Sequence, residues 1–536
     1  MNSRQSLLFF CSVLAGLALL SITFPSDGLV FGGGFRMRFP SLTEVMDKNY
    51  TQYDLEEEEE DEEEEGSSTE ETVEEPEQTN DLTPEELLQM RQDELNAQQI
   101  EEFRDYCTKN VARIYMPDDD ETYLDAFWET LQLASRKHIR IMHYGDSQIE
   151  CDRITSLLRQ KFQEEFGGMG VGLVPALQTI PTFTLSSRIT PDNVPQYLAY
   201  GPASMRGESN FYGPLAKVTH IPEEATIILK GKGGKDYGRA TRFRRVTVIT
   251  RQPATLLLTT GQEEEDEEPE EMPISSSGEP CFYTTTLPKS VNSVTLEVQG
   301  ETDILGIQLD GQTGVNIDNI PMRGSSGRDL MNISRSSLRP FFNRENVALF
   351  ILQFGGNSTP HLNRGKLHDF KESIKRLIHS CQTLEPKAKV LFIGPADMAR
   401  NREDGELETY PILPALNDSL RAAANEAGAA YWSMYAAMGG RGSMVRWVEA
   451  NPQLAGEDYI HFTPLGAKKI AKLLYDTLHL YYRFYLFRTG QENVELTAED
   501  SAVVNIKQKE QENVELTAED SAAVNFKQKE QEVQQE

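Results

Sequence analysis

Three short segments of this chain carry side chains that, brought together, are suited to breaking an ester bond. His143-Tyr144-Gly145-Asp146-Ser147-Gln148 places a serine directly after an apolar run. Gln353-Phe354-Gly355-Gly356-Asn357 places a side-chain amide after a second apolar run, and Asp458-Tyr459-Ile460-His461 places an acid three residues before a histidine. A serine hydroxyl becomes an effective nucleophile when an imidazole takes its proton and a carboxylate orients that imidazole. We therefore predict Ser147, His461 and Asp458 as a catalytic set.

The elements around these segments alternate between strands and helices. Strands are expected at 138–144, 347–354, 389–393 and 429–434, and helices at 154–166, 366–384, 412–427 and 464–482. This alternation predicts an α/β fold, a parallel sheet between two layers of helices. Ligands of such sheets bind beyond the carboxyl ends of the strands, where Ser147 and Asn357 both lie.

Residues 185–305 interrupt this alternation with short strands. The expected strands, at 225–229, 245–250, 254–259, 282–287 and 293–298, alternate in polarity or are β-branched. They predict an inserted domain that resembles a β-sandwich. Four aromatic residues of this region either stack on sugar rings or belong to ordinary packing: Tyr197, Tyr200, Phe211 and Tyr212.

The 536 residues carry a net charge of -33, much of it in runs at 56–65 and 263–271. Such runs repel themselves and stay solvated, so we predict an acidic linker over 26–82 and a surface loop at the second run. The acidic balance argues against nucleic-acid binding. Residues 83–136 are expected to form a helical lead-in, beginning at Thr83-Pro84-Glu85-Glu86. Residues 487–536 form a tail in which 491–510 recurs almost unchanged as 511–530.

The N-terminal residues 1–25 have the pattern of a signal peptide or a membrane anchor. Residues 7–24 are apolar and uncharged, and Arg4 precedes them. We favour an uncleaved anchor in the inner membrane, with the rest of the chain exported to the periplasm or cell envelope. The cysteines are scattered without the spacing of a metal site, and their pairing is left open.

The order of these motifs resembles the SGNH (GDSL-type) hydrolase superfamily over 138–184 and 306–482. Gly145-Asp146-Ser147 matches the block that holds the nucleophile, and Gly356-Asn357 and Asp458 with His461 match two later blocks. Gly324-Ser325-Ser326-Gly327 resembles the remaining block. The resemblance implies a flavodoxin-like three-layer core over 137–184 and 306–486. It also implies that the N–H groups of Ser147 and Gly327 and the Asn357 amide stabilise the oxyanion. Gln148 and Ser358 depart from the family pattern, which has leucine and commonly aspartate there.

Within the superfamily, the nearest resemblance is to envelope enzymes that remove O-acetyl groups from peptidoglycan or other polysaccharides. We expect such an esterase here, without metal or organic cofactor, since side chains suffice for the chemistry. One alternative is a membrane-tethered O-acetyltransferase that works with a multi-spanning acyltransferase partner. Another is a non-catalytic glycan-binding protein based on the inserted domain.

Overall fold

The structure, a computed structural model, describes residues 29–30, 36–37, 83–260 and 268–497. The chain divides into two units, Met1–Asn80 and Asp81–Glu536. In the first, β1 (Leu29–Val30) pairs antiparallel with β2 (Arg36–Met37). The second holds all the other described elements. The predicted anchor, most of the acidic linker and most of the duplicated tail lie outside the described residues, and no described helix has the length and apolarity needed to cross a membrane.

The core of the second unit is a sheet in the order β17-β4-β18-β19-β22-β3. Its strands are β3 (Ile114–Tyr115), β4 (His138–Gly145), β17 (Gly314–Pro321), β18 (Val347–Gln353), β19 (Lys389–Gly394) and β22 (Ala430–Ser433). The pairs from β17 to β22 are parallel. The sequence predicts a parallel sheet with strands at β4, β18, β19 and β22, but β17 is not among the predicted strands. β3 is an antiparallel edge strand from the lead-in, which we expected to be helical. A two-residue strand is too short to show a period of two in the sequence.

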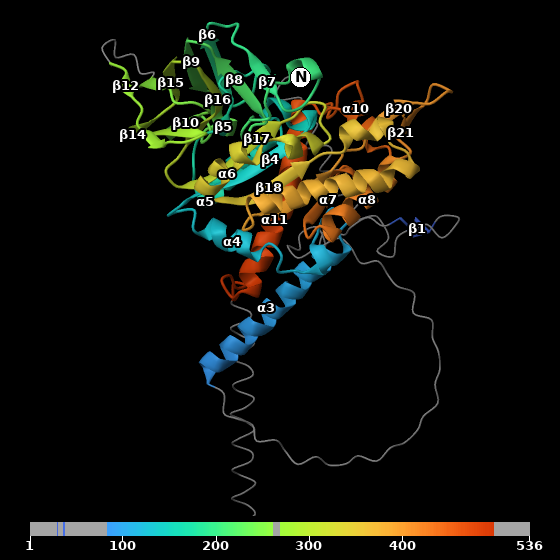
Figure 1. The fold of residues 1–536 in the computed structure, drawn as a ribbon. Coiled ribbons are helices and arrows are strands. Elements are labelled where there is room, and N and C mark those ends of the chain that lie inside the picture. Colours follow the sequence, from blue (N-terminus) through green and yellow to red (C-terminus); the bar gives the residue numbers. More distant parts are fainter. Residues whose placement is uncertain (1–28, 31–35, 38–82, 261–267, 498–536) are drawn as a thin grey trace, which may run out of the picture. The chain divides into compact units, whose positions relative to one another are not determined.

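Helices cover both faces of this sheet (Figure 1). Alternate side chains of β4 explain why: Ile139 and Ile141 pack with the helices of one face, whereas Met142 and Tyr144 pack with those of the other. The first face is covered by α4 (Asp125–Gln132), α5 (Thr155–Phe166) and α11 (Pro464–Arg488), and the second by α6 (Arg335–Arg344), α7 (Leu367–Leu384) and α8 (Leu413–Glu426). Smaller elements follow the sheet: β20 (Ala399–Asn401), β21 (Leu407–Thr409), α9 (Met434–Ala437) and α10 (Ser443–Glu449).

The insertion forms two antiparallel sheets that enclose an apolar core of their own. One sheet contains β5 (Gly172–Val174), β7 (Gln196–Leu198), β8 (Lys217–Ile221), β10 (Phe243–Thr250), β13 (Ile274–Ser276), β14 (Cys281–Val291) and β16 (Thr302–Asp310). The other contains β6 (Leu185–Thr190), β9 (Glu224–Gly231), β11 (Thr255–Thr260), β12 (Glu270–Glu271) and β15 (Ser293–Gln299). The strands thus extend beyond the predicted limits of 185–305, because β5 pairs with β16. The predicted acidic loop also contributes a strand, β12, at its end.

The two ends of the second unit are joined by polar contacts. α3 (Pro84–Lys109) lies along α11. The chain beyond α11 returns to α3, where Val494 N–H donates to Asn96 Oδ1 at 2.9 Å and Gln92 Nε2 donates to Val494 O at 2.8 Å. Val494 also packs beside Phe103 and Phe487. The first residues of the predicted tail therefore belong to the folded unit.

A buried arginine on β4 connects the sandwich to the core. Arg140 is fully buried, and its guanidinium contacts Asp310 of β16 at 2.6 Å, Asp318 of β17 at 2.7 Å and Glu345 after α6 at 3.1 Å. Burial on its own would raise the pKa of Asp310, but the charge of Arg140, with His138 and Arg245, holds that pKa at about 2. The ionised Asp310 therefore stabilises the fold fully above its unfolded pKa, near 4, and this contribution is lost as the pH falls toward 2.

We predict that Arg140→Met lowers the free energy of unfolding at pH 7 by about 3–5 kcal/mol, because it removes the cation of Asp318 and the closest ion-pair partner of Asp310 and Glu345. Urea denaturation monitored by circular dichroism measures the change. Arg188→Met, which removes an exposed arginine from β6, is the control and should change stability by less than about 0.5 kcal/mol. Equal stability of the two variants would contradict the role given to Arg140.

Candidate active site

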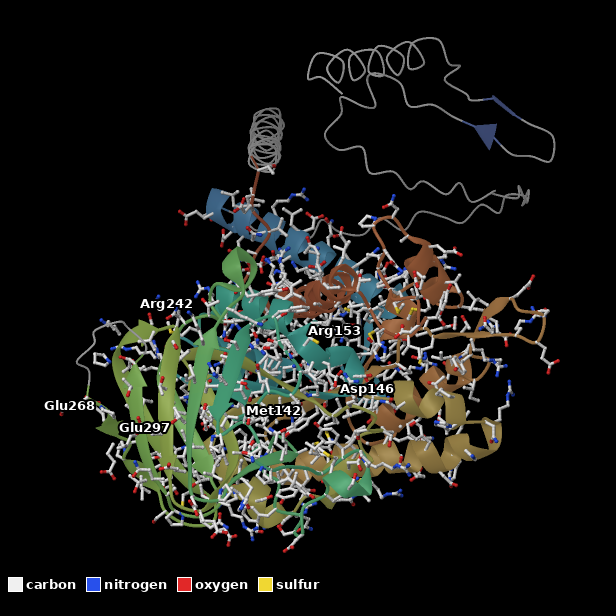
Figure 2. The ribbon with its side chains drawn as sticks, turned by 90° about the horizontal axis from the view of Figure 1, so that it is seen from above. Met142, Asp146, Arg153, Arg242, Glu268 and Glu297 are labelled. Atoms are coloured by element: carbon white, nitrogen blue, oxygen red, sulfur yellow. The ribbon has the colours of Figure 1, made fainter. Side chains whose placement is uncertain are left out.

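The predicted nucleophile lies in a tight turn where β4 ends. Asp146, labelled in Figure 2, caps the short helix η2 (Ser147–Asp152), and its Oδ1 accepts the N–H of Gln148 at 3.0 Å. The turn is tightly packed against its surroundings. A Cβ on Gly145 would lie 2.9 Å from Ile149 Cδ1 in η2 and 3.2 Å from Gln353 O in β18. Glycine at this position therefore lets Ser147 follow the strand directly and stand at the carboxyl edge of the sheet.

Ser147, His461 and Asp458 form a continuous chain of hydrogen bonds. Ser147 Oγ lies 2.8 Å from His461 Nε2, and His461 Nδ1 lies 2.7 Å from Asp458 Oδ2. The carboxylate accepts the proton on Nδ1, so Nε2 is left as the acceptor for the serine hydroxyl. Burial opposes ionisation of Asp458, but the N–H groups of His461 and Ile460 lower the pKa of this carboxyl below its usual value. The geometry is that of a serine nucleophile with its general base and orienting acid.

Gln148, the departure from the family pattern, connects the nucleophile turn to the histidine loop. Its Nε2 donates to Ile460 O at 2.5 Å. Its Oε1 is buried and has no hydrogen-bond partner among the residues that the structure describes. A leucine at this position would lack the contact. The sequence shows the departure but not its partner, which lies 312 positions along the chain.

The three predicted oxyanion donors are not equivalent in the structure. The N–H of Ser147 has no acceptor among the described residues, and Asn357 donates one amide hydrogen to Ser325 O at 3.1 Å, which leaves the second free. Gly327 N–H instead donates to Ser325 Oγ at 3.0 Å. Gly327 has φ 88°, and a Cβ there would lie 2.7 Å from Leu377 Cδ2, so close packing on α7 requires a glycine. Ser147 and Asn357 therefore each have an N–H available for an oxyanion, whereas the N–H of Gly327 is already bonded to Ser325.

A cavity of about 210 Å³, the Ser147 cavity, adjoins this chain of hydrogen bonds. It is lined by Asp146, Ser147, Gln148, Gln353, Phe354, Gly356, Asn357, Pro360, His361, Pro395, Ala396, Met398, Met434, Ile460 and His461. Burial raises the pKa of Asp146 to about 6. From the sequence, Asp146 was named only as part of the nucleophile block and Gln353 was assigned no role, because the residues at the end of one strand do not show which cavity they face.

The other histidines and acids that the structure describes do not form a second centre. His143 is buried, burial lowers its pKa to about 4, and it bonds Gln353 and Thr155 rather than the serine or His461. His361 lines the Ser147 cavity, whereas His368 does not. Within residues 83–260 and 268–497, no group of histidine, cysteine and acidic side chains has the arrangement of a metal site.

Comparison with known proteins identifies the family that part of the chain resembles. The profile of the GDSL-like lipase/acylhydrolase family matches residues 293–469, which include Asn357, Asp458 and His461. The α/β core is an SGNH-type ester hydrolase. The match begins after Ser147, which the structure brings to His461 from the other part of the core. A search of curated protein sequences gives no match.

One solved structure shows the same fold. A structure described as a peptidoglycan O-acetylesterase in action is 19% identical, has a TM-score of 0.56 and covers 69% of this chain and 99% of its own. Two others resemble the chain at TM-scores of 0.25 and 0.23. The first is a carbohydrate esterase of Corynascus thermopiles with a carbohydrate-binding domain (10% identity, covering 55% of this chain and 99% of its own). The second is a carbohydrate acetylesterase of Sinorhizobium meliloti (14% identity, 31% and 78%).

We predict that Gln148→Leu lowers kcat for 4-nitrophenyl acetate roughly tenfold, because it removes a buried hydrogen bond that holds the histidine loop. The variant should fold as stably as the parent, since it also removes an unpartnered buried oxygen. Steady-state kinetics and thermal unfolding measure the two quantities. Gln160→Leu, on α5 and away from the site, is the matched control. A variant with unchanged kcat would show that Gln148 does not position His461.

Proposed function

We propose that this SGNH hydrolase removes O-acetyl groups from an extracellular or cell-envelope polysaccharide. The observation that carries the proposal is the chain of hydrogen bonds Ser147–His461–Asp458 beside a small cavity. A cavity of roughly 150 Å³ holds benzene, so one of about 210 Å³ suits a short acyl group rather than a long one. The likeness to the peptidoglycan O-acetylesterase structure over most of this chain supports a carbohydrate ester.

The proposed reaction proceeds through an acyl-enzyme. Ser147 Oγ attacks the carbonyl carbon while His461 Nε2 takes the hydroxyl proton, and Asp458 stabilises the imidazolium. The N–H of Ser147 and the free amide hydrogen of Asn357 receive the negative oxygen. His461 then returns the proton to the leaving sugar hydroxyl. Water, activated by the same imidazole, attacks the acyl-enzyme and releases acetate.

The insertion offers few exposed aromatic rings for a glycan. Tyr200, Phe211 and Tyr212 are buried, so these three belong to packing, whereas Tyr197 is partly exposed. A glycan-binding protein without catalysis therefore finds little support in these aromatics. The transferase alternative would use the same acyl-enzyme with a sugar hydroxyl as acceptor. As part of the same proposal, residues 7–24 anchor an exported enzyme near its polymer.

We predict that Ser147→Ala and His461→Ala lower kcat for acetate release by roughly 10⁴–10⁶, and that Asp458→Asn lowers it by roughly 10⁴. Acetate released from 4-nitrophenyl acetate and from O-acetylated peptidoglycan or xylan is measured enzymatically. His379→Ala, which changes an exposed histidine on α7, is the control. Activity of the serine and histidine variants equal to the parent's would refute the site. Transfer of acetyl groups to an added glycan instead of water would favour the transferase.

We predict that Asn357→Ala lowers kcat roughly 10²–10³-fold with little change in KM, because the amide acts on charge that develops only in the transition state. Steady-state rates over a range of 4-nitrophenyl acetate concentrations give kcat and KM separately. Asn363→Ala, outside the Ser147 cavity, is the control. A loss confined to KM would show that Asn357 binds the ground state instead.

A further inference from the structure

A second cavity, of about 280 Å³, lies between the core and the sandwich on the other side of η2; we call it the sandwich cavity. Glu150, Cys151 and Asp152 of η2 line it, whereas Ser147 and Gln148 line the Ser147 cavity. Its apolar wall comes from both parts of the unit: Leu173, Leu185, Leu198, Leu215, Ile320 and Pro321. One short helix therefore separates the two cavities.

The charges around the sandwich cavity are paired with one exception. Glu150 accepts two hydrogen bonds from Arg323, at 2.7 and 2.5 Å, and Arg159 donates to both oxygens of Asp152 at 2.7 and 3.1 Å. The ammonium group of Lys217, the first residue of β8, makes no hydrogen bond or ion pair with any residue in the described ranges, although Lys217 lines the same cavity. The two pairs cancel, so the cavity carries one uncompensated positive charge.

The surroundings of Lys217 favour an anion as its partner. Burial lowers the pKa of Lys217, and the charge of Glu150 opposes this shift without reaching ion-pair distance. A cation among leucine side chains is costly unless a counter-charge accompanies it. The ligand that satisfies both features has one negative group and an apolar body.

The geometry points to a second ligand site, in which Lys217 binds the carboxylate of a straight-chain alkanoate whose hydrocarbon chain fills the sandwich cavity. A cavity of 150 Å³ holds benzene, with six carbons, so about 280 Å³ holds roughly a dozen non-hydrogen atoms. An alkanoate of about eight to ten carbons has that size. The site is distinct from the proposed acetyl site and does not depend on the polysaccharide assigned to it.

Binding of octanoate to the full chain tests the inference by isothermal titration calorimetry. The measurement uses the Ser147→Ala background, so that no ester chemistry accompanies binding. We expect one saturable site for octanoate. Its affinity should fall at least tenfold in Lys217→Met, which lacks the positive charge, and should stay within about threefold of the parent in Lys217→Arg, which keeps it. Lys289→Met, which removes an exposed lysine on β14, should bind octanoate like the parent.

Two further measurements locate the ligand. Octanoate should slow alkylation of Cys151, which lines the sandwich cavity, but not that of Cys107, as followed by peptide mass spectrometry. 1-Octanol, the uncharged analogue, should bind parent and Lys217→Met alike. Octanoate affinity unchanged in Lys217→Met, or no saturable binding at all, would overturn the inference. Protection of neither cysteine despite binding would place the ligand elsewhere and would also overturn it.

Discussion

The fold depends on the pairing of one buried cation, Arg140, with carboxylates from three separate segments. Asp310 ends the last strand of the sandwich, Asp318 lies on the neighbouring core strand, and Glu345 follows α6. Removing any of these charges from water is costly, so only the arrangement that brings all of them together is stable. The position of β4 is thereby fixed relative to β17 and the sandwich.

The ion pairs of Arg140 near the start of β4 fix the strand that Ser147 follows at its other end. Because β4 and β18 are parallel neighbours, the turns that follow them meet at one edge, where Ser147 and Asn357 lie. The histidine loop comes from the connection before α11 and has no strand to hold it in register. The hydrogen bond from Gln148 to Ile460 O holds this loop beside the nucleophile turn instead. A single amide thus replaces a packing contact where the family pattern has leucine.

The sequence predicts the parts of this structure whose signals are local. The strand at 138–144 and the helix at 366–384 each depend on residues within one segment, and the structure places both within a few positions of the prediction. Contacts between distant segments leave no such signal. The pairing of Arg140 and the contact of Gln148 with Ile460 were therefore not predictable. For Gly327 the resemblance identified the glycine but not the direction of its N–H.

The buried hydrogen bonds behind Ser147 also join residues that lie far apart in the sequence. Thr155 Oγ1 lies 2.8 Å from Asn319 Oδ1 and 2.9 Å from His143 Nδ1. On the other side of the ring, His143 Nε2 lies 3.1 Å from Gln353 Oε1. Asn319 lines the sandwich cavity and Gln353 lines the Ser147 cavity. The hydrogen bonds Asn319–Thr155–His143–Gln353 therefore join residues that line the two cavities without including Ser147.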